Sequence, residues 1–227
     1  MSDGLPVHAE ILKLARLLER DPATLEYLDQ LPADELRMLR GQATDVMFDA
    51  HGKALARLAT ASKVLPTGLI ATLAQRAFGP VLAARVAGLL EPGRAAEVAD
   101  KLPDEFLADV AIALDPRRAS AVIARIPPRR IGAVGRELLR REDYITLGRF
   151  VGYVGDEGLR AALEPMDGRA LVQVAVVLED TDQLEHVINL LSPSQLDDAI
   201  ERAREAGLLA QLGPLASTLP SARAASS

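Results

Sequence analysis

The side chains that could bind a metal ion or carry a proton are scattered along this chain. Its three histidines, His8, His51 and His186, lie far apart in the sequence. A histidine metal site needs ligands that converge at a defined spacing, and the best local cluster of acids surrounds His186. Asp182 lies four residues before His186, so the two would share a helix face. Acidic residues are also typical of the first turn of a helix. We therefore predict a solvated helix start here and no metal ligand.

The glycine and serine motifs that mark many enzymes are absent or incomplete. The Gly132–Gly135 segment lacks the full phosphate-binding pattern and a preceding strand, and Gly52-Lys53 is followed by Ala54, where a P-loop has serine or threonine. No Gly-x-Ser-x-Gly motif occurs, and the lack of cysteine excludes thiolate catalysis and cysteine-bound zinc. We predict no catalytic residue and no cofactor, although an enzyme can also assemble its catalytic residues from distant parts of a fold.

The densest charge in the chain is a run of arginines. Between Arg117 and Arg149 there are nine arginines and three acids, in a chain whose net charge is −6. Two arginine pairs in this run follow prolines and should fall in the first turn of a helix, where the helix dipole disfavours cations. Residues that break such a rule without compensation are candidates for a functional role.

We predict that consecutive antiparallel helices would gather five arginines on one edge of the fold: Arg94, Arg117, Arg118, Arg140 and Arg141. Such an edge, beside exposed helix N–H groups, attracts anions. The expected partner is an acidic protein surface or a phosphorylated ligand. Duplex DNA is not expected, because the rest of the chain is strongly acidic. The alternative is a solvated arginine face with acids from neighbouring helices nearby.

The composition predicts an aliphatic core in a cytoplasmic protein. Of 227 residues, 49% are hydrophobic but only 3% are aromatic, with no tryptophan and no cysteine. The N-terminus shows no basic segment followed by an apolar run, so no secretory signal is expected. The most apolar stretch, Leu65–Leu90, contains Arg76, Arg85 and a Gly79-Pro80 break. We therefore predict a buried helix pair there and no membrane span.

Helical periodicity dominates the whole chain. An apolar stripe predicts a helix over 7–20, and Asp21-Pro22 is typical of a capped start of the next helix. A longer helix should begin at Pro32, with Gly41 and Gly52 as weak points, and Ser192 should cap the last helix. The most strand-like stretch, 172–178, also keeps a helical register.

Prolines divide the middle of the chain into short repeats. Pro92, Pro103, Pro116 and Pro127 are separated by 11, 13 and 11 residues, and an apolar segment of about three turns follows each. Helices this short must stack on one another. We predict an all-α fold containing a short-helix α-solenoid (superhelix), with Val110 and Ile123 in its core. The predicted boundaries are an N-terminal helical segment (1–65), the helical-repeat superhelix (66–217) and a disordered tail (218–227).

A leucine–proline–alanine pattern in the repeats resembles a known family. Leu90–Val98 follows Leu-x-Pro-x-x-Ala-Ala-x-Val, and Leu114–Ala119 follows its first part. Residues 89–138 thereby resemble the N-terminal superhelical domain of MgtE-type magnesium transporters, and the related repeats of flagellar motor switch proteins. The resemblance implies a cytosolic regulatory or interaction domain. Because this chain lacks the transporter's regulatory modules and membrane helices, transport is not expected.

The resemblance also raises the question of a magnesium site. It would involve an acidic cluster within the repeats: Glu97, Asp100, Asp104, Glu105 and Asp109. Protein carboxylates usually hold magnesium loosely, and acids just after Pro103 are also typical of a first helical turn. We favour the helix-start interpretation and predict no metal ligand.

Two functions are compatible with these features. The favoured one is a non-enzymatic interaction or regulatory module that binds another protein, or a second copy of itself, through a solenoid face and the arginine edge. The alternative is a helical protein with an aliphatic cavity, lined by Leu65–Leu90, that binds or acts on a hydrophobic small molecule. An enclosed apolar pocket favours the alternative, whereas a packed interior with a broad exposed apolar patch favours a protein partner.

Overall fold

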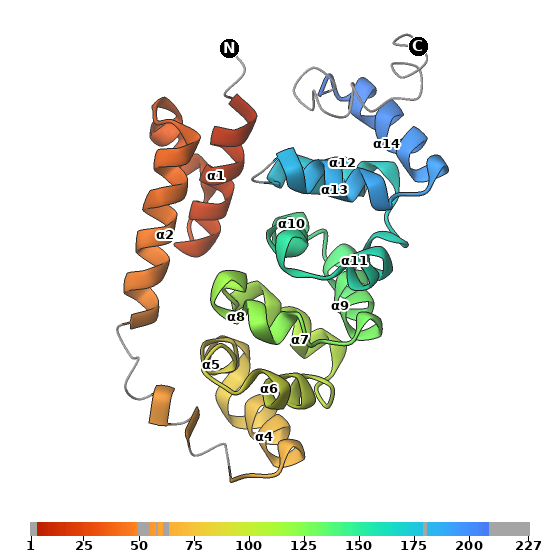
Figure 1. Ribbon diagram of the computed structural model, residues 1–227. Coiled ribbons are helices and arrows are strands. Elements are labelled where there is room, and N and C mark those ends of the chain that lie inside the picture. The colour runs from red at the N-terminus through yellow and green to blue at the C-terminus, as the bar shows by residue number, and fades with distance from the viewer. Residues whose placement is uncertain (1–3, 50–54, 58, 61–63, 179–180, 209–227) are drawn as a thin grey trace. The chain divides into compact units, whose positions relative to one another are not determined.

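Helices form all the regular secondary structure in the described part of the chain, and no strand occurs there. A computed structural model describes residues 4–49, 55–57, 59–60, 64–178 and 181–208 (Figure 1). The predicted all-α class is therefore confirmed, and the strand-like stretch 172–178 lies at the end of a helix. None of the described helices combines the length and the apolar character needed to cross a membrane.

The chain divides into two compact units, which are described separately. Unit 1 consists of Met1–Met47 together with Met166–Ser227, and unit 2 is Phe48–Pro165. The predicted boundaries after residues 65 and 217 remain predictions. Periodicity identifies a helix but not its distant partners, so it could not indicate that the first and last helices share a unit. The tail predicted for 218–227 lies outside the described residues.

Unit 1 is built from the two ends of the chain. Its helices are α1 (Gly4–Leu17), the 3-10 helix η1 (Pro22–Gln30), α2 (Ala33–Asp49), α12 (Gly168–Val177), α13 (Thr181–Leu190) and α14 (Pro193–Glu205). Asp21 caps η1, and Ser192 caps α14 in a capping box with Gln195, as predicted. Helix α2 continues through Gly41, whereas Gly52 lies outside the described residues.

Unit 1 contains two apolar clusters, one from each end of the chain. One joins α1, η1 and α2 through Val7, Ile11, Leu14, Ala15, Leu25 and Leu36. The other joins α12, α13 and α14 through Val172, Leu184, Ile188 and Ala203. At the start of α12, the Gly168 N–H donates to the Asp198 carboxylate at 2.6 Å. A Cβ atom on Gly168 would lie only 2.5 Å from the Asp198 carbonyl carbon, so this contact requires glycine.

Unit 2 is a continuous series of short helices. They are α4 (Thr67–Leu73), the π-helical turn η2 (Ala74–Phe78), α5 (Gly79–Ala87), α6 (Pro92–Ala99), α7 (Asp104–Ala113), α8 (Pro116–Ile123), α9 (Pro128–Arg140), α10 (Tyr144–Phe150), the 3-10 turn η3 (Val151–Tyr153) and α11 (Asp156–Leu163). Helices α6, α8 and α9 begin on prolines, as predicted. The carboxylates of Glu91 and Asp115 cap α6 and α8 by accepting from backbone N–H groups.

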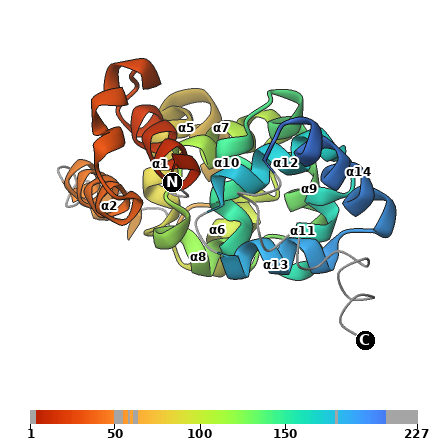
Figure 2. The ribbon, with the colours of Figure 1, turned by 90° about the horizontal axis from the view of Figure 1, so that it is seen from above.

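Helices of unit 2 pack mainly against helices two positions along the chain. Helices α5, α7, α9 and α11 form one contacting series, and α4, α6 and α8 form another. Figure 2 shows α5 and α7 on one side and α6 and α8 on the other. Val110 of α7 and Ile123 of α8 are both buried, which confirms these predicted core positions.

Two glycines of α9 pack closely against α11. A Cβ atom on Gly132 would lie 3.0 Å from the Ala161 Cβ, and one on Gly135 would lie 3.0 Å from the Ala162 Cβ. Both alanines belong to α11. The Gly132–Gly135 segment, which does not fit a phosphate loop, therefore serves the packing of α9 on α11.

Candidate ligand-binding cavity

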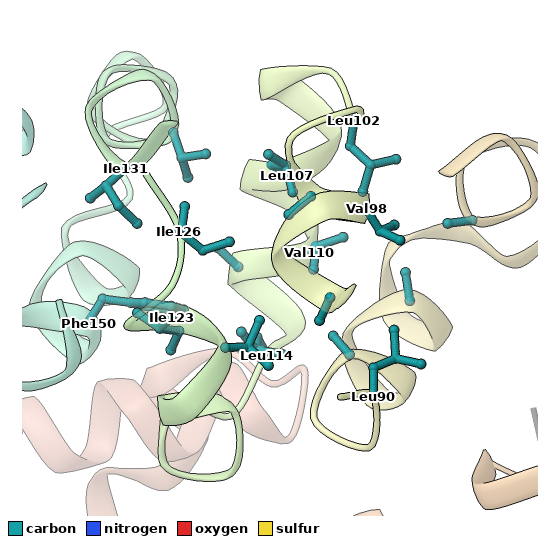
Figure 3. Close-up of a pocket in the computed structure, with 18 of the residues that line it drawn as sticks. Leu90, Val98, Leu102, Leu107, Val110, Leu114, Ile123, Ile126, Ile131 and Phe150 are labelled. Atoms are coloured by element: carbon teal, nitrogen blue, oxygen red, sulfur yellow. The ribbon is translucent and has the colours of Figure 1, made fainter. Parts of the chain in front are cut away.

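Unit 2 contains an apolar cavity of about 250 Å³. Both helix series contribute to its wall, from α4 at one end of the unit to α11 at the other. Figure 3 shows ten of the lining side chains around the space: Leu90, Val98, Leu102, Leu107, Val110, Leu114, Ile123, Ile126, Ile131 and Phe150. The cavity is therefore a feature of the stack of helices and not of one loop.

The wall of the cavity is chemically uniform. Each described lining residue is leucine, isoleucine, valine, alanine, glycine or phenylalanine. The predicted Leu65–Leu90 segment contributes, among others, Leu65, Phe78 and Leu90, and later helices supply the rest. These side chains offer dispersion contacts and shape, but no hydrogen bond, charge or nucleophile.

Small side chains explain why this space is not filled. Ala95 and Ala99 of α6, Ala111 of α7 and Gly135 of α9 all face it. Two clusters of buried residues, one around Val98 and Leu102 and one around Val110, Leu114 and Ile123, contribute to the wall. With few aromatic residues in the chain, little side-chain volume remains to fill the space between them.

The cavity is partly open to solvent, so water can enter it. The apolar side chains that line it offer no hydrogen bond to that water. An apolar molecule that displaced the water would gain dispersion contacts and apolar burial.

A hollow between α1 and η1 in unit 1 is larger, about 650 Å³, but differs in character. Its lining includes the exposed polar residues His8, Glu26, Asp29 and Gln30. Water can solvate these groups fully, so nothing in this hollow requires a ligand. The apolar cavity in unit 2 is therefore the stronger candidate.

The arginines predicted to form one anion-binding edge belong to three separate groups by their contacts. Arg94 lies at the start of α6 and donates from its guanidinium to the Leu65 carbonyl. Its backbone N–H and that of Gly93 donate to Glu91, and these hydrogen bonds lower the pKa of the Glu91 carboxyl below its usual value. Arg94 thus connects the start of α6 to the chain just before α4.

Arg117 and Arg118 share a buried carboxylate at the start of α8. Arg117 makes two hydrogen bonds to Asp115, at 3.1 and 2.9 Å, and Arg118 approaches the same carboxylate at 3.8 Å. Asp115 also caps the helix by accepting from the Arg117 N–H at 3.1 Å. The acid therefore compensates the unfavourable position of two cations at a helix N-terminus.

Arg140 and Arg141 share Glu137 at the end of α9. Hydrogen bonds from Arg140, and then from Arg141, lower the pKa of Glu137 to about 2. Arg141 also reaches α7, where it pairs with Asp109 at 2.5 Å and donates to the Glu105 carbonyl. These contacts lie within α7, whereas Arg117 and Arg118 follow its C-terminal end. The alternative interpretation, arginines paired with acids of neighbouring helices, therefore describes Arg141.

Two further arginines of the run, which were not among the five predicted for the edge, cap helix C-termini. Arg130 of α9 donates to the carbonyls of Ala99 and Leu102 at the end of α6, and Arg149 of α10 donates to those of Ile112 and Leu114 at the end of α7. The last carbonyls of a helix lack partners within it, and a cation is favoured there. The dense run of arginines therefore supplies caps and bridges within unit 2.

The acidic cluster of the repeats is largely neutralised by arginine. Asp100 pairs with Arg129 at 2.7 Å, Asp104 pairs with Arg130 at 2.5 Å, and Asp109 pairs with Arg141. Among the described residues, no group of three or more histidine and acidic side chains could hold a metal ion. The predicted solvated face around His186 agrees with the exposure of His186 and Asp182, and His51 lies outside the described residues.

A buried ionic cluster in unit 1 was not predicted from the sequence. The Glu10 carboxylate of α1 is only 1% exposed and lies 3.1 Å from Lys13, 3.0 Å from Arg40 and 3.5 Å from Arg37. Because Arg37 and Arg40 belong to α2, the cluster joins α1 to α2. Its residues come from positions about 30 apart in the chain, and the sequence offers no signal that they converge.

Comparison with known proteins finds no matching family model, no matching curated protein and no matching solved structure.

Proposed function

We propose that this protein binds a hydrophobic molecule in the apolar cavity of unit 2. The observation that carries the proposal is a cavity of about 250 Å³ whose described lining side chains are all apolar. Ligand sites are typically concave, largely apolar and a few hundred Å³ in volume. Burial of an apolar molecule against these side chains is favourable, which supports an occupant in the functional state.

The proposed activity is binding rather than catalysis. The described wall offers no group that could donate a proton, accept one or attack a substrate. An apolar molecule held there would be sequestered from water, which is the role of a carrier or of a ligand-responsive regulator. The proposal adopts the alternative weighed from the sequence.

The proposed architecture of unit 2 is a short superhelix. It is supported by the two parallel series of contacts, α5–α7–α9–α11 and α4–α6–α8. A kinship with the superhelical domain of MgtE-type transporters and with flagellar motor switch repeats is part of this proposal and rests on residues 89–138. A cytoplasmic location is likewise proposed from the composition.

A single-tryptophan reporter tests ligand binding directly. The chain has no tryptophan, so Phe150→Trp places one fluorophore in the cavity wall (Figure 3). Titration with 1-octanol should change the emission of this variant in a saturable manner. Tyr27→Trp, at a position that is 68% exposed in unit 1, is the matched control and should respond only linearly. The same linear response from both variants would contradict the proposal.

A protein-interaction module is the second candidate. It is favoured by large apolar side chains that remain exposed in α4, η2 and α5: Leu69, Phe78 and Val81. Such a surface suits another protein or a second copy of the chain, and the arginine groups could add contacts to an acidic or phosphorylated partner. Light scattering of the wild type and of Val81→Asp tests self-association. A monomeric mass for both, with no partner recovered by mass spectrometry after pull-down from the source cells, would contradict this candidate.

A further inference from the structure

The size of the cavity limits the ligand to a small number of heavy atoms. A water molecule occupies about 30 Å³ in the liquid, so 250 Å³ holds about eight groups of the size of water or a methylene. That is below the range of roughly 300–1,000 Å³ typical of drug-sized ligands. Molecules with large fused ring systems therefore exceed the space available.

The positions of the lining residues along the helix stack limit the shape of the ligand. Lining residues come from successive helix layers, such as Val98 of α6, Val110 of α7 and Ile131 of α9 (Figure 3). Neighbouring packed helices are ~8–10 Å apart. A small volume shared among several layers is elongated, so it fits a chain better than a compact ring.

The chemistry of the wall limits where a polar group can lie. Burying a hydroxyl or a charge without a partner costs several kcal/mol, and the described lining residues have no polar side chain. Any polar group on the ligand must therefore stay in solvent at the mouth of the cavity. The polar group can then differ between ligands without altering how the chain is held.

We propose that the cavity binds one unbranched hydrocarbon chain of about eight carbons, with its polar end outside. This inference rests on the proposed function, because it specifies the ligand class of the same cavity. The space within the wall sets the length of chain that is bound, and solvent accepts whichever polar group the chain carries.

A chain-length series tests this inference on the full-length Phe150→Trp protein. Straight-chain alcohols from 1-butanol to 1-dodecanol should bind about fourfold more tightly for each added methylene. This gain in affinity per methylene should stop when the chain reaches about eight carbons. The matching series of carboxylates should stop at the same length, because the polar group lies outside. Cyclooctanol, with eight carbons in a ring, should bind at least tenfold more weakly than 1-octanol.

The chain length at which the affinity stops rising should shift in opposite directions in two variants. Ala99→Leu adds three carbons to the cavity wall, and Leu107→Ala removes three; both positions are only half-buried, which favours folding. The limit should fall by about three carbons in the first variant and rise by about three in the second. Ala121→Leu, at an exposed position of α8 outside the wall, is the control and should leave the limit unchanged.

The possible outcomes separate this inference from the proposed function. Absence of saturable binding by every alcohol would overturn both. Three results would overturn only the linear-chain inference. They are saturable binding whose affinity keeps rising with chain length, a length limit that is the same in Ala99→Leu and Leu107→Ala as in the parent protein, and equal affinity for cyclooctanol and 1-octanol. Opposite shifts in the two cavity variants, with an unchanged control, would support it.

Discussion

At the scale of single residues, arginines of unit 2 connect helices through backbone carbonyls. Arg130 takes this role at the end of α6 and Arg149 at the end of α7. The guanidinium group has several donors in one plane, so it can serve a carboxylate and a carbonyl together. An arginine that makes such contacts contributes more to folding than one that forms a single surface ion pair.

Arg130→Gln and Arg129→Gln should therefore differ in stability. Arg130 is 14% exposed and bonds two carbonyls and Asp104, whereas Arg129 is 71% exposed and pairs with Asp100. We expect Arg130→Gln to lower the free energy of unfolding by about 1–3 kcal/mol, and Arg129→Gln by less than about 1 kcal/mol. Urea unfolding followed by circular dichroism measures both. Equal losses would contradict the capping role.

Glu137 should make the stability of the protein depend on pH in acid. Its pKa falls to about 2 in the folded state because Arg140 and Arg141 donate to it, whereas an unfolded glutamate titrates near 4.3. Its contribution is therefore present above about pH 4 and is lost as the pH falls towards 2. Unfolding of Glu137→Gln, measured between pH 5 and 2, should depend less on pH than that of the wild type. If the free energies of unfolding of the two proteins change with pH in parallel, the pairing of Glu137 with Arg140 and Arg141 does not contribute to stability.

At the scale of helices, glycine determines how closely the axes approach. Gly168 on α12 meets the backbone of α14, and Gly132 and Gly135 on α9 meet α11. Glycine normally weakens a helix relative to alanine, by about 1 kcal/mol. At these positions the close contact outweighs that penalty, so adding a methyl group should have the opposite of its usual effect.

Gly168→Ala should destabilise the protein, while Gly68→Ala should not. The new Cβ at residue 168 would lie 2.5 Å from the Asp198 carbonyl carbon, so α14 would have to move. We expect a loss of about 1–3 kcal/mol, as for overpacking. Gly68 lies in α4, where a Cβ atom would meet nothing within 4 Å, so alanine there should be neutral or slightly stabilising. Thermal unfolding distinguishes the two, and a gain in stability at residue 168 would exclude the tight contact.

Ile123→Ala should cost less than the same change at Ile200. Both side chains are buried, with 5% and 6% exposed, but only Ile123 lines the cavity. Because Ile123 already lacks contacts on one side, we expect about 2–3 kcal/mol for Ile123→Ala and about 3–5 kcal/mol for Ile200→Ala. Chemical denaturation measures the difference. A larger loss at Ile123 would indicate that its surroundings are fully packed.

The sequence was informative about helices and uninformative about their long-range contacts. Pro92, Pro116 and Pro128 start helices because proline fits the first helical position, and Ser192 caps α14 for an equally local reason. The partners of Arg141 and Glu10 include residues about 30 positions away in the chain, and periodicity carries no such information. The Leu65–Leu90 segment was identified as cavity-lining, but the cavity extends through helices that the sequence placed in the core.

At the scale of the whole molecule, the two units differ in how the chain builds them. Unit 2 is one continuous segment, Phe48–Pro165, whereas unit 1 needs both ends of the chain. All the described residues that line the cavity lie within unit 2. Unit 2 therefore contains the complete proposed binding site.

A fragment comprising residues 48–165 should fold alone and retain the cavity. Its helices make their main contacts with one another, so we expect a helical circular dichroism spectrum and a cooperative melting transition. A fragment of residues 1–47 keeps the cluster of α1, η1 and α2 but lacks the contact of α1 with α12, so it should melt less cooperatively. Octanol should raise the melting temperature of the first fragment, since a ligand stabilises the state that binds it. A non-cooperative transition would show that unit 2 depends on unit 1.

The discontinuity of unit 1 also determines the order in which the protein can fold during synthesis. Helices α1 and α2 leave the ribosome first, but α12 to α14 follow only after all of Phe48–Pro165 has been translated. At roughly 5–20 residues per second, this delay is on the order of ten seconds, far longer than helix formation or collapse. During that interval unit 2 can fold and acquire its apolar cavity while unit 1 is incomplete. A hydrophobic ligand or a chaperone could therefore engage the nascent chain before α1 makes its contact with α12.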